Sequence, residues 1–156
     1  MTELLVARTM MNQQTDSLAV ALFSEILTVD QLARHTVAKA LPKGMELSHF
    51  SVLNHLARAQ TEKTPAQLAR TFHLTRGAMT NTLRKLENSG YVHIRPDWDD
   101  ARRKLVTISP AGLSARDAAI AAISPIIARA VDKVGYETVR PILSVMRELR
   151  IQLSEE

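Results

Sequence analysis

The chain has 156 residues, no cysteine and a formal net charge of +4. This length suits a single domain with a sizeable buried core, and the lack of cysteine excludes disulfides, thiolate zinc sites and thiol redox switches. No apolar run is expected to span a membrane, and the N-terminal residues lack the pattern of a signal peptide. We therefore expect a cytoplasmic protein that has no membrane partner.

The positive charge is concentrated in one part of the chain. Residues 58–104 carry ten Lys/Arg and five Asp/Glu, a net +5, whereas the remainder carries ten and eleven, a net −1. This distribution favours a polyanionic partner for one segment. A charge-rich but merely solvated subdomain has the same composition, so charge alone does not decide between the two.

The first part of the chain is expected to form two helices. Residues 1–14 show no period and are expected to form a partly ordered arm, after which Thr15, Asp16 or Ser17 caps a long helix to about Leu41. Pro42-Lys43-Gly44 ends this helix. A shorter helix, capped by Ser48, is expected to run to about Ala59 and to support the neighbouring elements.

Residues 64–88 predict a helix-turn-helix. Thr64 begins the first helix with Pro65 at its first position and Gln67 completing a capping box. His73-Leu74 forms the turn, and Thr75 caps the second helix. The buried face is expected to consist of Leu74, Ala78, Met79, Leu83 and Leu86. Small and polar residues at the front of this second helix suit insertion into a DNA groove.

A two-stranded wing and two long helices are expected after the stop at Gly90. Residues 91–95 and 104–109 alternate like strands, and the charged segment between them is too long for a tight turn. A helix from Pro110 should kink or split at Pro125, and a last helix follows Gly135. The apolar first and last helices predict an isologous homodimer, with a monomeric bundle as the alternative.

The order of these elements resembles the MarR family of winged helix-turn-helix transcription regulators. The resemblance covers residues 17–153 and rests on LSHFSVLNHLA, TPAQLARTFHLTRGAMTNTLRKLENSGYVHI and DDARRKLVTISPAG. It implies a mainly α fold with a two-stranded wing, organised as one domain, 1–156. Within it, residues 45–109 would bind DNA, and residues 17–41 and 110–153 would form the dimerisation helices.

The resemblance also implies a function. The chain is expected to bind a palindromic, double-stranded DNA operator as a homodimer, with recognition helices in major grooves and wings at minor grooves. It would act as a repressor, be released by a small aromatic effector, and use no cofactor. The family's Asp-Arg-Arg wing motif reads Asp100-Ala101-Arg102 here, which reduces the expected number of wing contacts.

The exposed face of the predicted recognition helix supplies the first group of candidate DNA contacts. Arg76 and Asn81 have the donor geometry to read guanine and adenine edges. Gly77 allows close backbone approach, Thr80 suits a thymine methyl or a phosphate, and Arg84 points toward phosphate. The cap at Thr75 leaves helix N–H groups available to a phosphate. A solvated polar face is the alternative for each residue.

The wing supplies the second group. Arg102 is expected to enter the minor groove, and Asp100 is expected to hold that arginine or the wing turn in shape. Arg103 and Lys104 would contact phosphates or simply cover an exposed strand face. Trp98 is expected to pack across the base of the wing rather than against DNA.

Three other functions are less consistent with the sequence. A zinc-responsive regulator of the same fold would use Glu46, His49 and His35, although no histidine pair has the i,i+4 spacing of a helical clamp, and no metal site is expected. An enzyme is disfavoured because no phosphate loop, nucleophile elbow or paired carboxylates stand out. A non-enzymatic protein-interaction module using the basic wing remains an alternative.

An effector pocket would lie where the first, second and fifth helices meet the winged part. Its candidate residues are His35, His49, Phe50 and Leu53. Ordinary core packing at this junction is an equally good explanation of all four.

Overall fold

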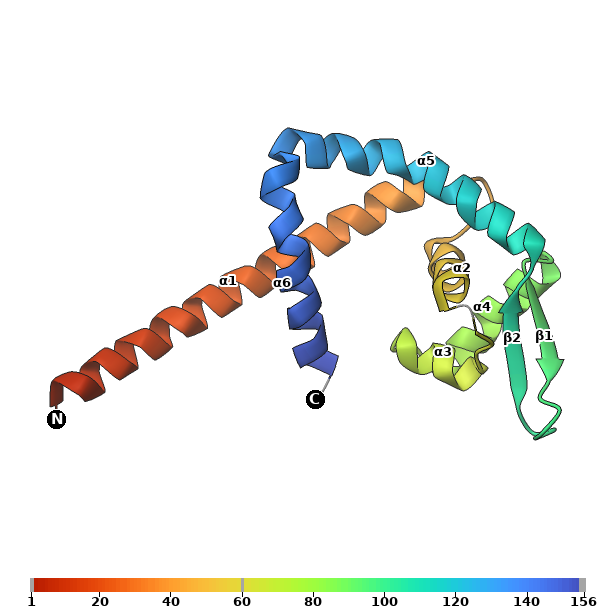
Figure 1. The fold of residues 1–156 in the computed structure, drawn as a ribbon, viewed down its shortest axis with the longest axis horizontal. Coiled ribbons are helices and arrows are strands. Elements are labelled where there is room, and N and C mark those ends of the chain that lie inside the picture. Colours follow the sequence, from red (N-terminus) through yellow and green to blue (C-terminus); the bar gives the residue numbers. More distant parts are fainter. Residues whose placement is uncertain (1, 60, 155–156) are drawn as a thin grey trace. The chain divides into compact units, whose positions relative to one another are not determined.

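A computed structural model describes the backbone of residues 2–59 and 61–154, and the side chains of those residues from position 14 onward. The chain divides into two compact units, residues 1–39 and 40–156. Figure 1 shows the order of elements: two helices, a helix-turn-helix, a two-stranded sheet and two further helices.

The first unit is one continuous helix. Helix α1 spans Thr2–Ala40 and carries an internal Arg34–Asp30 ion pair at 2.7 Å. The predicted arm over residues 1–14 and the cap at Thr15, Asp16 or Ser17 are therefore wrong, because the backbone is already helical from Thr2. The sequence there lacks a clear apolar period, but it also lacks proline and glycine, so nothing interrupts the helix.

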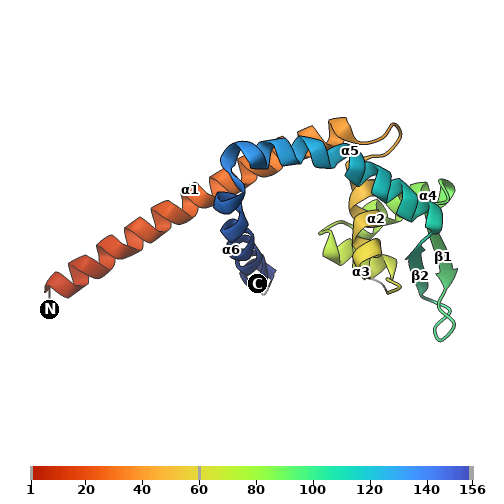
Figure 2. The ribbon, with the colours of Figure 1, turned by 45° about the horizontal axis from the view of Figure 1, so that its top comes forward.

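Three short helices form the centre of the second unit. These are α2 (Leu47–Ala59), α3 (Pro65–Thr71) and α4 (Arg76–Asn88). Their apolar faces meet in one core with the sheet, and this core consists of Val52, Leu53, Leu56, Leu68, Ala69, Met79, Leu83, Leu86, Val92 and Val106. In Figure 2 the three helices lie together near the end of α5 that the sheet leads into. This core holds the helix-turn-helix as one body.

The predicted helix starts are largely confirmed. The Thr64 side chain accepts the Gln67 N–H while the Gln67 side chain accepts the Thr64 N–H, which is a complete capping box with Pro65 behind it. Thr75 caps α4 by accepting the Ala78 N–H. Ser48, however, lies inside α2, which begins at Leu47, so its predicted capping role is wrong.

The burial predicted for α4 is correct in part. Met79, Leu83 and Leu86 are buried, whereas Ala78 is exposed and Leu74 is 42% exposed. Leu74 lies in the α3–α4 turn, where His73 adopts a positive φ of 50° and the Leu74 N–H bonds to the Ala69 carbonyl. This tight turn rotates Leu74 away from the core, which a helical period does not anticipate.

Two antiparallel strands form the wing. Strand β1 (Val92–Pro96) pairs with β2 (Lys104–Ile108), with Ile94 opposite Val106. Gly90, at φ 72°, provides the predicted left-handed stop between α4 and β1. Lys63 also bridges to Val106 on the outer edge of β2. The α2–α3 connection therefore fixes the wing to the helix-turn-helix.

Helices α5 (Pro110–Val134) and α6 (Tyr136–Ser154) complete the second unit. A split at Pro125, one of the two predicted outcomes, does not occur, because α5 continues to Val134. Pro125 has no N–H to donate to the Ala121 carbonyl. Both residues are exposed, so water can satisfy that carbonyl.

Among the described residues, α5 is long and apolar enough, by length and composition, to cross a membrane. The sequence-based expectation that no apolar segment is long enough to span a membrane is therefore wrong. Long apolar helices that are covered within soluble proteins meet it as well, so the finding assigns no membrane role.

Apolar side chains on α6 are left largely uncovered. None of its described residues is buried. Those exposed by at least 38% are Tyr136, Ile142, Leu143, Val145, Met146, Ile151 and Leu153. An amphipathic helix whose apolar face is exposed lacks the packing that normally stabilises it.

Candidate nucleic-acid interface

Helix α4 presents a polar face on the side opposite its buried residues. Arg76, Gly77, Thr80, Asn81 and Arg84 are all exposed, as the helical spacing predicts once Met79, Leu83 and Leu86 are buried. The Thr75 cap leaves part of the first turn's N–H groups open to solvent, and no acidic residue lies in that turn. This end of the helix is therefore favourable to an anion.

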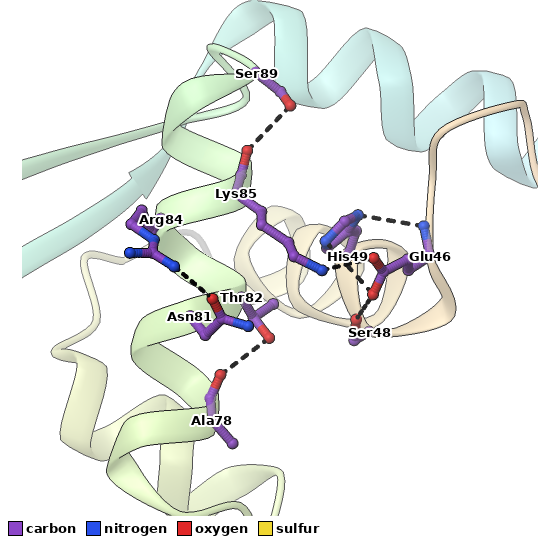
Figure 3. A network of polar contacts seen from close by, with 9 residues as sticks. All are labelled: Glu46, Ser48, His49, Ala78, Asn81, Thr82, Arg84, Lys85 and Ser89. Carbon is purple, nitrogen blue, oxygen red and sulfur yellow. Dashed lines mark hydrogen bonds and ion pairs between the residues drawn. The ribbon is translucent and has the colours of Figure 1, made fainter.

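Hydrogen bonds within α4 orient three of these side chains. Arg84 Nη2 donates to Asn81 Oδ1 at 2.9 Å, so the two lie side by side along the helix (Figure 3). The Thr80 hydroxyl donates to the Arg76 carbonyl at 2.8 Å. Because Asn81 uses only its oxygen in the Arg84 bond, its amide N–H groups stay available to an acceptor.

The turn between the strands is shaped by aspartates. Asp100 Oδ1 accepts the Arg102 N–H at 3.1 Å, and the Asp100 carbonyl accepts the Arg103 N–H at 2.9 Å. The Asp97 carboxylate accepts the Asp99 N–H and lies 3.9 Å from Arg103 Nε. Asp100 thus shapes the wing turn, one of the two roles expected for it.

The wing and α4 converge on one hollow of about 360 Å³. It is lined by Thr64, Pro65, Ala66, Arg76, Thr80, Arg102, Arg103 and Lys104. Four of these eight residues are cationic and none is acidic. The α3 start, the α4 front and the wing therefore bring Arg76 together with the three basic wing residues, although they are distant in sequence.

A second hollow of about 510 Å³ extends this surface along α4. It is lined by Pro65, Thr80, Leu83, Arg84, Glu87, Ile94, Arg95, Pro96 and Lys104. Arg84 therefore lies beside the wing as well. Of the predicted contact residues, Thr75, Gly77, Asn81 and Asp100 are not among those lining either hollow.

Two ion pairs that link the site to its supports are not predicted from the sequence. Arg95 Nε donates to Glu62 Oε1 at 3.0 Å, with a second bond between the two groups, so β1 is clamped to the α2–α3 connection. Lys85 on α4 pairs with Glu46 at 2.7 Å (Figure 3). The partners are 33 and 39 residues apart in the chain, so no local spacing signals them.

His49 is buried directly beside the second of these pairs. Its Nδ1 accepts the Glu46 N–H at 3.2 Å, whereas its buried Nε2 has no hydrogen-bond partner among the described residues. Burial lowers the pKa of His49; the Glu46 carboxylate opposes this and Lys85 reinforces it. The Lys85 hydrogen bond, followed by the charge of His49, lowers the pKa of Glu46.

The candidate effector residues occupy different environments. Leu53 is fully buried in the core and His49 is 9% exposed. Phe50 lines a hollow of about 500 Å³ with Ser51, Asn54, His55, Arg58, Ala59, Phe72 and Arg150. His35 is exposed on α1, in the other compact unit. An effector site at these residues stays a prediction.

Trp98 does not pack across the base of the wing as expected. It is 85% exposed, and the Arg95 guanidinium lies 5.4 Å from its ring centroid. The indole therefore extends into solvent beside Arg95 instead of being covered by the sheet. Within the described part of the chain, no cluster of three or more His, Cys, Asp or Glu is arranged to hold a metal.

Comparisons with known proteins agree with this geometry. Residues 43–103 match the MarR family. Wild-type MarR from E. coli, in its apo form, is 21% identical with a TM-score of 0.72, covering 82% of this chain and 96% of its own. BldR from Sulfolobus solfataricus is 23% identical with a TM-score of 0.67, covering 81% and 94%. No curated protein sequence matches the chain.

One further neighbour was solved in a complex. A cysteine-to-serine mutant of MarR from E. coli, complexed with operator DNA, is 21% identical with a TM-score of 0.71, covering 84% of this chain and 94% of its own. The predicted resemblance to the MarR family and the predicted winged-helix fold class are both confirmed.

Proposed function

We propose that the chain is a sequence-specific DNA-binding transcription regulator, because residues 43–103 match the MarR family and the chain has the fold of solved MarR proteins. The observation that carries the proposal is the hollow where Arg76, Arg102, Arg103 and Lys104 converge. Four cations from two elements, with no acidic residue beside them in the lining, match a phosphate-lined groove. The operator complex of the E. coli mutant supports the same function. The proposed function is DNA binding without enzymatic activity.

In this proposal α4 reads bases in the major groove. Arg76 donates to a guanine, and Asn81 contacts an adenine through its free amide. Arg84, which holds the Asn81 oxygen at 2.9 Å, fixes the amide orientation and contacts a phosphate. Thr75, Gly77 and Thr80 allow the start of the helix to approach the backbone closely.

The wing contacts the adjacent minor groove. Arg102 enters it, while Asp100 acts indirectly by shaping the turn that presents Arg102. Arg103 and Lys104 bind flanking phosphates. The Lys63–Val106 bridge and the Glu62–Arg95 pair hold the wing to the α2–α3 connection, so the wing and the helix-turn-helix can dock with little reorganisation.

The proposal includes a homodimer. The exposed apolar residues of α6, such as Leu143 at 52%, and those of α1, such as Leu18 at 70%, need a cover. A second copy of the chain supplies the same apolar faces, and a two-fold dimer sets two recognition helices one DNA turn apart. Leu143→Glu should convert the dimer to a monomer in sedimentation equilibrium.

Three finer points rest on the family's pattern. We propose that the protein acts as a repressor in the cytoplasm and is released by a small aromatic effector. The family resemblance is their support, with Phe50 beside a hollow of about 500 Å³ as the one structural observation. His35, His49 and Leu53 complete the proposed effector group.

Salt dependence of binding tests the proposal. Affinity for labelled mixed-sequence duplex DNA should fall steeply as salt rises, because phosphate contacts release counterions. Removing the two cations proposed to bind phosphates, in Arg103→Ala/Lys104→Ala, should reduce the slope of log K against log salt by about 2. A matched variant at the exposed Lys133 on α5 should leave the slope unchanged. Salt-independent binding, or none, would refute the function.

A further inference from the structure

Trp98 is the largest exposed apolar side chain of the wing turn. It is 85% exposed and is the only tryptophan in the chain. An aromatic side chain of this kind buries about 150–250 Å² of surface, and an indole has a single polar N–H. An indole exposed to water lacks the stabilisation that comes from burying this surface. A contact with a binding partner would provide that stabilisation.

The ring is held in place by an arginine that is itself held. The Arg95 guanidinium lies 5.4 Å from the Trp98 ring centroid. Its donors are engaged by the Glu62 carboxylate and by the Pro96 carbonyl at 3.0 Å. Arg95 is therefore poorly placed to bind a phosphate and instead provides a fixed cationic platform for the indole.

Two of the three carboxylates of the turn are engaged within it. Asp97 and Asp100 each accept a backbone N–H of the turn, and the Asp97 side chain is only 14% exposed. Asp99 is exposed, but so are Arg102 and Arg103. Segment 97–103 nevertheless carries three carboxylates and two guanidinium groups, so its net charge alone does not favour a polyanion. The positive potential comes from the hollow beside the turn, where Arg102 and Arg103 lie with Arg76 and Lys104.

Trp98 also lies next to the proposed DNA-binding surface. Arg95, which contacts its ring, lines the same hollow as Thr80, Arg84 and Lys104. The wing turn that bears Trp98 also bears Arg102 and Arg103, which line the other hollow. The turn that bears Trp98 therefore adjoins both hollows, although Trp98 is not among the residues that line either one.

We infer that Trp98 is a DNA-contacting residue whose ring packs against the deoxyribose face of the minor groove beside Arg102. Arg95 and Glu62 are positioning residues for that ring. This inference rests on the proposed function and adds an apolar contact to an otherwise electrostatic wing. A protein surface would also accept an exposed indole, but the shared turn with Arg102 favours DNA.

The intrinsic fluorescence of Trp98 reports the contact directly, since no other tryptophan contributes. Protein is titrated with mixed-sequence duplex DNA at low salt, and binding is followed in parallel by the anisotropy of a label on the DNA. The indole emission should change in intensity and wavelength with the same midpoint as the label. An unchanged emission at saturation would overturn the inference while leaving the proposed function intact.

Substitution separates the apolar contact from the electrostatic ones. Trp98→Ala should weaken binding about tenfold without changing the salt slope, because no charge is removed. Trp98→Phe, which keeps a ring, should lie between Trp98→Ala and the wild type. Arg103→Ala, which removes a proposed phosphate contact, should instead lower the salt slope by about 1. Equal affinity of Trp98→Ala and wild type would refute the contact.

Two further measurements complete the experiment. Glu62→Gln should weaken the clamp on Arg95 and lower the steady-state anisotropy of the indole emission, which a role for Glu62 in the fold alone would not do. An emission change that depends on protein concentration without DNA would mean that the ring contacts a second copy, and would overturn the inference. If the wild-type label anisotropy never rises, both the inference and the proposed function fail.

Discussion

The Nζ atom of Lys85 on α4 lies 2.7 Å from Oε1 of Glu46, just before α2. The Glu46 backbone N–H in turn donates to Nδ1 of the buried His49. Glu46 therefore joins α4, which is proposed to read DNA, to His49. The hydrogen bond between Glu46 and His49 requires a neutral imidazole, because Nδ1 is the acceptor. Protonation of His49 would convert that acceptor into a donor.

The first prediction concerns acid stability. Burial lowers the pKa of His49, and burial with nearby Lys63 and Arg58 lowers the pKa of His55. A histidine whose folded pKa lies below its unfolded value stabilises the protein at higher pH. That stability is lost as pH falls below about 6.5. The free energy of unfolding should therefore decrease between pH of about 7.5 and about 5.5.

Asparagine at position 49 provides the matched variant. Its Oδ1 can accept the Glu46 N–H as Nδ1 does, but it does not titrate. His49→Asn should reduce the pH dependence measured by urea unfolding, and His49→Asn/His55→Asn should nearly remove it. An unchanged pH dependence in the double variant would assign the acid sensitivity to other groups.

The second prediction separates two glycines. A Cβ at Gly112 would overlap the Tyr91 carbonyl oxygen and lie 2.9 Å from Ile108 Cγ1. That carbonyl is fixed by the Ser109 N–H, so Gly112→Ala should destabilise the protein by at least about 2 kcal/mol. Urea unfolding measures this effect. If the variant were as stable as the wild type, the backbone at Tyr91 in the α4–β1 connection would have to shift to make room for the added Cβ.

Gly77→Ala is the contrasting variant. A Cβ there meets nothing within 4 Å, and alanine favours a helix over glycine by up to about 1 kcal/mol. The variant should be as stable as the wild type or slightly more so, and should bind DNA more weakly because the added methyl holds α4 away from the groove. Unaltered DNA affinity would show that Gly77 does not approach the backbone.

Local sequence predicts the features that depend on near neighbours in the chain. The caps at Thr64 and Thr75 and the stop at Gly90 depend on side chains and backbone a few positions away. The order of the helices and the wing is predictable for the same reason. The outward face of α4 follows from the helical period once its buried leucines are identified.

The remaining features depend on contacts that local sequence does not encode. The Glu46–Lys85 and Glu62–Arg95 pairs join residues more than thirty positions apart. Leu74 departs from its predicted burial because the positive φ of His73 turns it outward. Trp98 is expected to be covered because large apolar residues usually are, but its side chain is 85% exposed and contacts Arg95.

The third prediction concerns the wing. Arg102→Ala should weaken binding to a selected operator by about 1–3 kcal/mol without unfolding the protein, because Arg102 is exposed and its backbone N–H keeps the bond to Asp100. A gel-shift titration measures the affinity and circular dichroism checks the fold. Operator binding equal to that of the wild type would remove Arg102 from the interface.

The fourth prediction concerns base selection. Asn81→Ala removes the amide proposed to contact adenine and also frees Arg84, which loses its 2.9 Å hydrogen bond. The base preference at that position should relax, while non-specific affinity at low salt should change little. Sequencing of DNA selected by the variant provides the readout. Recovery of the wild-type site with equal stringency would show that Asn81 does not read a base.

Operator recognition by a two-fold dimer is best tested by selecting bound duplexes from a random DNA pool with the wild-type protein. One recognition helix per half predicts an enriched palindrome whose half-sites lie about one helical turn apart. Asn81→Ala should lose preference at a symmetric pair of positions within it. A pool that remains random after repeated selection would contradict sequence-specific recognition by this chain.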